Sequence, residues 1–133
     1  MQVNFCLLAS VLTVSLLVSP LTAHSQSKDM KDSDFALLPS FCKTRLRGNP
    51  QEWKPLMQRW GRDTFEDIHH HCFGLYFQNK ARFASKKVDK AEFLRRSIGE
   101  FSYVLQQWPA DTPLRPEAEN AKRQSEFMLK FLK

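Results

Sequence analysis

Residues 63–84 read DTFEDIHHHCFGLYFQNKARFA, and they decide the fold because their apolar residues recur at helical spacing. The recurring apolar positions are Phe65, Ile68, Cys72 and the adjacent pair Leu75 and Tyr76, so that each step along the stripe is three or four residues. This spacing places them on one face of an α-helix. Phe73 and Phe77 widen the face into a broad apolar arc, which suits a helix packed against two neighbours. We therefore predict a long central helix with partners on both sides.

Residues 90–109, KAEFLRRSIGEFSYVLQQWP, predict a second long helix. Its apolar residues also follow helical spacing: Leu94, Ile98, Phe101, Leu105 and Trp108. Pro109 ends this helix, and Asp, Thr and Pro within 110–115 indicate a turn. Pro116 and Glu117 suit the start of a last helix, whose inner stripe is Ala118, Ala121, Ser125, Met128 and Leu132. A basic connector over 85–89 is expected between the two long helices.

Shorter helices are expected before residue 63. Residues 38–46 carry one apolar stripe at helical spacing, and Gly48 to Pro50 interrupt it. Asn49 is suited to cap a further helix with Pro50 in its first turn, although the interior Pro55 leaves a start nearer Lys54 as an alternative. No segment alternates with the period of a β-strand. The predicted fold is all-α: short N-terminal helices, an antiparallel helix pair and a C-terminal helix within one domain over 35–133.

The first 27 residues contain no Lys, Arg, Asp or Glu. Residues 5–18 form an apolar run of 14 residues, followed by Ser19-Pro20 and then by small residues up to Ser25. A short apolar segment, a helix breaker and a small-residue site are typical of a secretory signal peptide. We predict removal of residues 1–25 by cleavage after Ser25 and a periplasmic or secreted protein. An uncleaved anchor is the alternative, which would need a longer apolar run.

The expected mature chain has 108 residues and keeps the whole formal charge of +6. Residues 26–34 are polar and charged, and we expect them to form a disordered leader. An exported basic protein meets few nucleic acids, so its anionic neighbours are expected to be an acidic protein or peptide, an anionic membrane or a cell-wall polymer. Solubility alone is the other explanation of the charge.

Two cysteines, Cys42 and Cys72, remain after the predicted cleavage. In an oxidising compartment a pair of cysteines indicates one disulfide bond. A cytosolic location would favour two buried free thiols instead.

The second long helix resembles the second helix of a tetratricopeptide repeat. That motif places a small, a large and a small residue ahead of a proline, and Ser97, Phe101, Val104 and Pro109 have this spacing. In the preceding helix, Gly74 and Phe77 stand where the motif has glycine and tyrosine, while His70 replaces its tryptophan. The resemblance covers residues 63–133 and implies close helix packing at Gly74.

The chain also resembles a group of small exported bacterial proteins usually described only as tetratricopeptide-like. The matching residues are Phe41-Cys42, Trp60-Gly61, His69-His70-His71, Gly74-Leu75 and Tyr103-Val104-Leu105. This likeness implies the fold and no activity. Helix pairs of this kind present a concave face to a protein or peptide, and a homodimer or a larger partner that stacks on the last helix would complete it.

The run His69-His70-His71-Cys72 contains only residue types that ligate metals. Adjacent residues of a helix point about 100° apart, so three neighbouring histidines cannot converge on one ion. His69 and His70 remain weak metal candidates, and packed or rim histidines, with His71 solvated, are the structural alternative. A cysteine nucleophile beside a histidine base needs an orienting group and a pocket, which no pattern marks.

Cationic residues gather around the predicted connector, and we name five as a candidate binding cluster: Lys86, Lys87, Lys90, Arg95 and Arg96. A solvated loop is the alternative. The sequence favours an exported, non-catalytic adaptor that needs no cofactor and binds a protein or peptide in the envelope. Metal or small-ligand binding at His69 and His70 is the second hypothesis.

Overall fold

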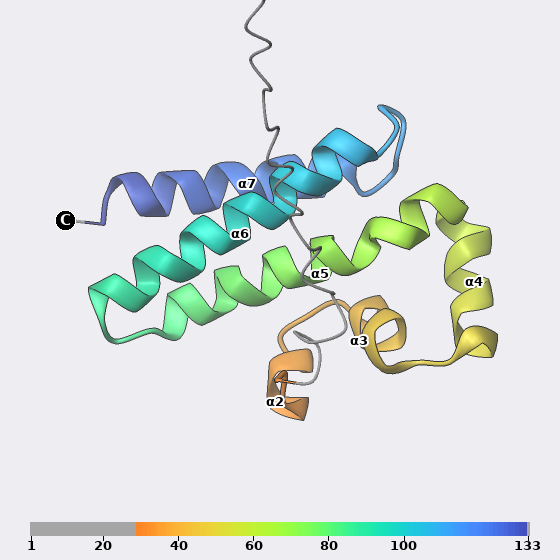
Figure 1. Cartoon of the computed structure of the whole chain (residues 1–133), viewed down its shortest axis with the longest axis horizontal. Coiled ribbons are helices and arrows are strands. Elements are labelled where there is room, and N and C mark those ends of the chain that lie inside the picture. Colours follow the sequence, from red (N-terminus) through yellow and green to blue (C-terminus); the bar gives the residue numbers. More distant parts are fainter. Residues whose placement is uncertain (1–28, 133) are drawn as a thin grey trace, which may run out of the picture.

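The computed structural model describes residues 29–132, and the described chain is helical throughout (Figure 1). The helices are α2 (Asp32–Phe35), α3 (Ser40–Arg47), α4 (Pro50–Trp60), α5 (Arg62–Phe83), α6 (Lys87–Gln107) and α7 (Arg115–Lys130). No strand occurs among the described residues, so the predicted all-α fold is confirmed. The proposed signal peptide and its cleavage site lie outside the described residues. No helix within 29–132 is long and apolar enough to cross a membrane.

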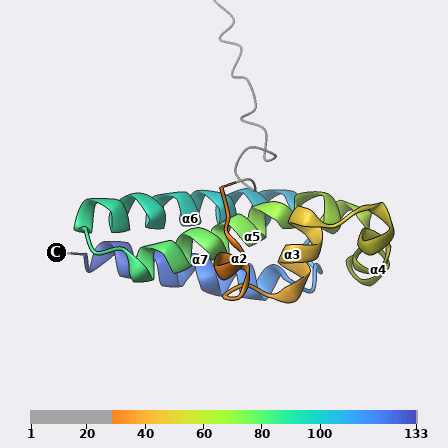
Figure 2. The same cartoon turned by 90° about the horizontal axis from the view of Figure 1, so that it is seen from below.

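Helices α5, α6 and α7 lie side by side and form the body of the molecule, with α6 in contact with both others (Figures 1 and 2). Gly74 on α5 allows a close approach of α6, since a Cβ there would lie 2.7 Å from the Phe101 ring of α6. Ser97 donates a hydrogen bond of 2.9 Å to the Gly74 carbonyl. Phe77, Phe101 and Ser97, which the resemblance places among the packing residues, are buried.

Three buried polar residues of α5 fix the position of α7 and of the turn before it. Thr64, His71 and Gln78 stand seven residues apart and therefore share one face of α5. Each meets a polar partner across the interface: Thr64 with Thr112 at 3.4 Å, His71 with Glu117 at 3.3 Å, and Gln78 with the Ala121 carbonyl at 2.9 Å and Ser125 at 3.0 Å. We call these pairs the polar seam. Because an unpaired buried polar group is costly, the seam favours a single register of α7.

The N-terminal helices cover the middle of α5. Cys42 of α3 and Cys72 of α5 form the predicted disulfide bond, with an S–S distance of 2.07 Å and both residues fully buried. Arg45 of α3 adds a second link, because it donates to the Phe65 and Glu66 carbonyls at 3.2 Å and lies over the Phe65 ring.

Helix α4 begins at Pro50 and runs through Pro55, so the alternative start near Lys54 is wrong. The Asn49 side chain accepts from the backbone of Gln51 and Glu52, and Glu52 accepts from the Asn49 backbone, which completes a capping box. Pro55 has no backbone N–H, so the carbonyl of Gln51 lacks its usual helical hydrogen bond. Both residues are exposed, so water can satisfy this carbonyl. Gly61 then turns the chain from α4 into α5 at a φ of 81°, a backbone conformation that favours glycine.

Two boundaries differ from the sequence prediction. The expected disordered leader, residues 26–34, contains the start of α2, and Met30 is only 2 % exposed. Met30 is ordered because it packs with Phe35 and Phe73 in one apolar cluster. The connector predicted over 85–89 is also shorter, because α6 already begins at Lys87.

Candidate functional site

The candidate site lies where the C-terminal ends of α5 and α7 meet the N-terminal end of α6 (Figure 1). We call this region the basic end. Four of the six large hydrophobic side chains that are exposed within 29–132 lie here, namely Phe83, Val88, Phe127 and Phe131. Cations stand among them: Arg82, Lys86, Lys87, Lys90, Arg123 and Lys130. Exposed apolar side chains gathered in one place and rimmed by polar groups are typical of an interaction surface.

A hollow of about 510 Å³ opens between α5 and α7 at the basic end. We call it the basic groove, and its lining is Arg82, Arg123, Gln124, Phe127 and Met128. A second hollow of about 280 Å³ shares Arg82, Phe127 and Met128 with it and extends to Lys90 and Phe131. The lining of the groove is almost entirely apolar, so Arg82 and Arg123 contribute mainly the aliphatic parts of their side chains beside Phe127 and Met128.

Within residues 29–132, the cations of the basic end have no acidic partner. The ion pairs of residues 29–132 instead join Arg47 to Asp32, Arg62 to Glu66, His70 to Glu100, His71 to Glu117, Arg115 to Glu119 and Lys122 to Glu126. Residues Arg82, Lys86, Lys87, Lys90 and Arg123 take part in none of them. Their positive charge is thus free to face an outside ligand.

The charge of the basic end also opposes the dipole of α6. Cations stabilise the C-terminus of a helix and destabilise its N-terminus. Lys80 and Arg82 lie in the last turn of α5 and follow this rule. Lys86 and Lys87 break it, because they occupy the N-cap and the first position of α6, where Lys86 makes no capping hydrogen bond. Helix stability therefore does not account for these two lysines.

The five cations of the predicted cluster do not form one patch. Lys86 and Lys87 are exposed at the connection, and Lys90 lies beside the groove. Arg96 instead places its guanidinium 4.0 Å from the centre of the Phe77 ring, on the α5–α6 surface that carries Lys80 and Phe93. We reassign Arg96 to packing, since a cation over an aromatic face is stabilised there. Arg95 is exposed on α6 and lines neither hollow of the basic end.

The three adjacent histidines point to three different surroundings. His69 is half-buried, and its Nδ1 donates to the Glu66 carbonyl at 2.8 Å. Burial lowers the pKa of His69 to about 4, with the nearby charges of His70 and Arg45 adding to the effect. His69 is therefore neutral near pH 7.

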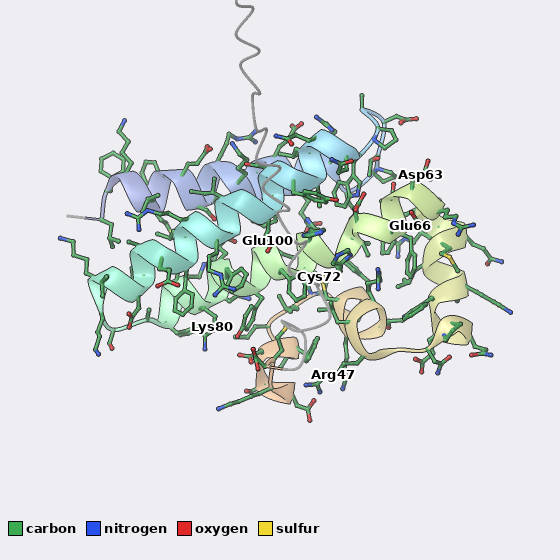
Figure 3. All side chains as sticks on the ribbon, in the orientation of Figure 1. Arg47, Asp63, Glu66, Cys72, Lys80 and Glu100 are labelled. Atoms are coloured by element: carbon green, nitrogen blue, oxygen red, sulfur yellow. A yellow bond between two sulfur atoms is a disulfide. The ribbon has the colours of Figure 1, made fainter. Side chains whose placement is uncertain are left out.

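His70 belongs to a second group of side chains, on the surface between α5 and α6. Its Nδ1 donates to Glu100 at 2.6 Å, and its ring lies 4.1 Å from that of Tyr103. Tyr103 is hydrogen-bonded to Asp67, and partial burial raises the pKa of the Asp67 carboxyl. Figure 3 shows Glu100 in this central region, well away from Asp63 and Glu66 at the far end of α5.

His71 is fully buried, which corrects the expectation that it is solvated. His71 is buried because it faces α7 in the polar seam and lies against Phe101 and Trp108. Its hydrogen bond lowers the pKa of Glu117. Within 29–132, no three His, Cys, Asp or Glu residues are grouped so that they could hold a metal ion.

A larger hollow of about 660 Å³ lies between α2, α3 and the start of α4. Its lining mixes both signs of charge: Asp32, Lys43, Arg47 and Glu52. Arg47 is bonded to Asp32 and lies over the Phe35 ring, and Glu52 belongs to the capping box. Because these groups already serve the fold, this hollow is a weaker candidate than the basic groove.

Sequence reasoning missed the α7 side of the groove, namely Arg123, Gln124, Phe127 and Met128. Some of these residues lie on the inner stripe of α7 and others on its exposed face. Their spacing in the sequence therefore does not predict that they line one hollow together with Arg82. A Phe at position 127, outside the inner stripe, was the signal that could have identified them.

Comparison with protein-family models, curated proteins and solved structures found no significant match. The resemblance to a tetratricopeptide repeat therefore stays a prediction.

Proposed function

We propose that the protein is an exported, non-catalytic adaptor that binds an acidic, partly apolar segment of another protein in the basic groove. The observation that supports this most is an apolar hollow of about 510 Å³ that the exposed Phe127 lines and that Arg82 and Arg123 flank. Neither arginine forms an ion pair with a residue of 29–132. Arginine binds carboxylates in a bidentate manner. Aromatic and arginine side chains are also the residues that contribute most at protein interfaces.

Charge favours a foreign acidic segment over a second copy of the same surface. In a symmetric dimer formed through the groove, the same patch of both copies meets. Arg82 and Arg123 of one copy would then face the same cations of the other, and this repulsion opposes association. A ligand with carboxylates beside apolar side chains matches both halves of the groove.

The surroundings of the histidines support a binding role over catalysis or metal binding. Cys72 is held in the disulfide and offers no thiolate. His70 is engaged by Glu100, and His71 is enclosed in the polar seam. We therefore place the function at the basic end and not at the histidine run, and expect no cofactor.

Affinity capture from a cell-envelope extract tests the adaptor hypothesis. The bait is the purified chain, compared with the double variant Arg82→Glu/Arg123→Glu and with the control Lys43→Glu/Lys54→Glu, which makes the same change in charge at exposed sites of α3 and α4. We expect a partner that is retained by the wild type and the control and lost by the groove variant. A partner retained equally by all three proteins, or none retained by the wild type, would contradict the proposal.

A further inference from the structure

We propose that the connection between α5 and α6 docks on an anionic lipid surface, with Phe83 and Val88 entering the interface and Lys86 and Lys87 binding the headgroups. We call residues 83–88 the tip. Phe83 is the last residue of α5, and Val88 lies in the first turn of α6. They are the two most exposed large hydrophobic residues within 29–132, at 73 % and 70 %. The tip is a separate surface from the basic groove, which neither residue lines.

The charge of the tip complements an anionic bilayer. The tip itself contains two cations, Lys86 and Lys87, and no carboxylate. The residues that flank it, 82 and 89–90, add Arg82 and Lys90 against the single carboxylate of Asp89. None of these four cations forms an ion pair with a residue of 29–132. Near an anionic leaflet each lysine strengthens membrane binding by about fivefold. Binding to anionic headgroups would explain why Lys86 and Lys87 stand at the N-terminus of α6, where the helix dipole disfavours cations.

The shape of the tip favours lipid over a second protein. A stable protein interface buries roughly 800 Å² on each partner around a packed core. The tip offers two protruding apolar side chains, set apart by small and cationic residues, and these provide too little area for such a core. A membrane has no such requirement, since shallow insertion of a few apolar side chains adds to electrostatic attraction.

Vesicle co-sedimentation tests this proposal. The purified chain is mixed with vesicles of phosphatidylcholine alone or of phosphatidylcholine with phosphatidylglycerol, and the test variants are Lys86→Glu/Lys87→Glu and Phe83→Ser/Val88→Ser. We expect binding to the anionic vesicles that weakens with salt, a loss of about 25-fold or more in the lysine variant, and a clear loss in the apolar variant. The variants differ from the wild type only at the substituted residues, so the differences in binding report on the tip.

Two controls keep the result specific. Leu37→Ser removes an apolar residue that is 55 % exposed on another part of the molecule, and Lys43→Glu/Lys54→Glu changes charge elsewhere. Both should bind vesicles like the wild type. Equal binding by the wild type and the lysine variant would overturn the proposal. Binding lost only in the lysine variant would show adsorption to a polyanion and overturn insertion.

Insertion is measured directly with a tryptophan at the tip. In Phe83→Trp the introduced indole should shift its emission to the blue and be quenched by brominated lipids, whereas the indole of Leu37→Trp should not. The native Trp53, Trp60 and Trp108 are common to both variants. The groove residues are unchanged in these tip variants, so a failure to bind vesicles would not contradict the adaptor hypothesis. Equally, a failure to capture a partner protein would not contradict the proposal that the tip binds lipid.

Discussion

Gly74 shows at the residue scale how one missing side chain sets the packing of the bundle. The α5–α6 contact is close because no Cβ stands between α5 and the Phe101 ring. Ser97 uses the same approach to reach the Gly74 carbonyl and also lies 3.0 Å from the Ser125 hydroxyl of α7. A small residue at position 74 therefore permits both the apolar and the polar contacts among three helices.

A matched pair of glycine substitutions tests this role. Alanine gains roughly 1 kcal/mol over glycine in a helix, so Gly99→Ala should stabilise the protein, since nothing lies within 4 Å of the added Cβ. In Gly74→Ala the Cβ meets Phe101 at 2.7 Å, and overpacking costs about 1–3 kcal/mol. We expect a net loss at position 74, measured by urea unfolding. Equal stabilisation by both changes would contradict the close packing at Gly74.

His69 makes stability depend on pH. Its pKa is about 4 in the folded protein against 6.5 ordinarily, so between these values the unfolded chain binds more protons. The free energy of unfolding should therefore fall as pH falls from 6.5 to 4, by on the order of 2 kcal/mol after allowance for partial exposure. His69→Asn keeps a donor for the Glu66 carbonyl and should flatten this slope in urea titrations. An unchanged slope would refute this role of His69.

We expect Lys86 to lower the stability of the fold and to strengthen binding to anionic membranes. Its backbone has the extended conformation of an N-cap, but its side chain makes no cap. In Lys86→Ser the hydroxyl can accept from the Asp89 backbone, which typically adds about 1 kcal/mol of stability. We expect a higher Tm together with about fivefold weaker binding to anionic vesicles. Thermal unfolding and co-sedimentation of the same sample check both, and a variant with unchanged Tm and unchanged vesicle binding would argue against this account of Lys86.

At the scale of elements, the disulfide secures the N-terminal helices to the bundle. Closing a loop of 30 residues stabilises a fold by about 3–4 kcal/mol in the chain-entropy account. Cys42→Ser/Cys72→Ser should lower the free energy of unfolding by this amount in urea titrations. Wild-type protein should behave like this variant only after reduction. No effect of reductant on the wild type would show that the bond is absent in solution.

The positions of the helices also show how much of the fold can be predicted from the sequence. Periodicity places α5, α6 and α7 to within a few residues, because each buries a continuous apolar stripe. The resemblance to a tetratricopeptide repeat implies the Gly74 contact, and the predicted oxidising compartment indicates the cysteine pair. Periodicity fails at Met30, which packs partly against Phe73 of a distant helix. It also fails at His71, whose Nε2 finds its partner in Glu117 of α7 while its Nδ1 has no hydrogen-bond partner within residues 29–132. The regular spacing of Thr64, His71 and Gln78 was the available signal for the polar seam.

At the scale of the whole molecule, charge is distributed unevenly along the bundle. Acidic side chains such as Asp63 and Glu66 lie at one end, next to α4, and Lys80 lies toward the other end (Figure 3). The basic groove and the tip share this second end. A protein that met a bilayer through the tip would carry the groove beside the membrane, so the two surfaces are compatible with a membrane-associated adaptor.

The central claim is that the basic groove holds an acidic segment of a partner, and site-specific photo-cross-linking in the producing cells tests it most directly. A photoreactive residue replaces Gln124 in the groove or, as control, Gln51 on the exposed face of α4. We expect a discrete adduct at position 124 alone, which maps to a segment rich in Asp and Glu and disappears with Arg82→Glu/Arg123→Glu. Absence of an adduct at position 124, or one that survives this charge reversal, would contradict it.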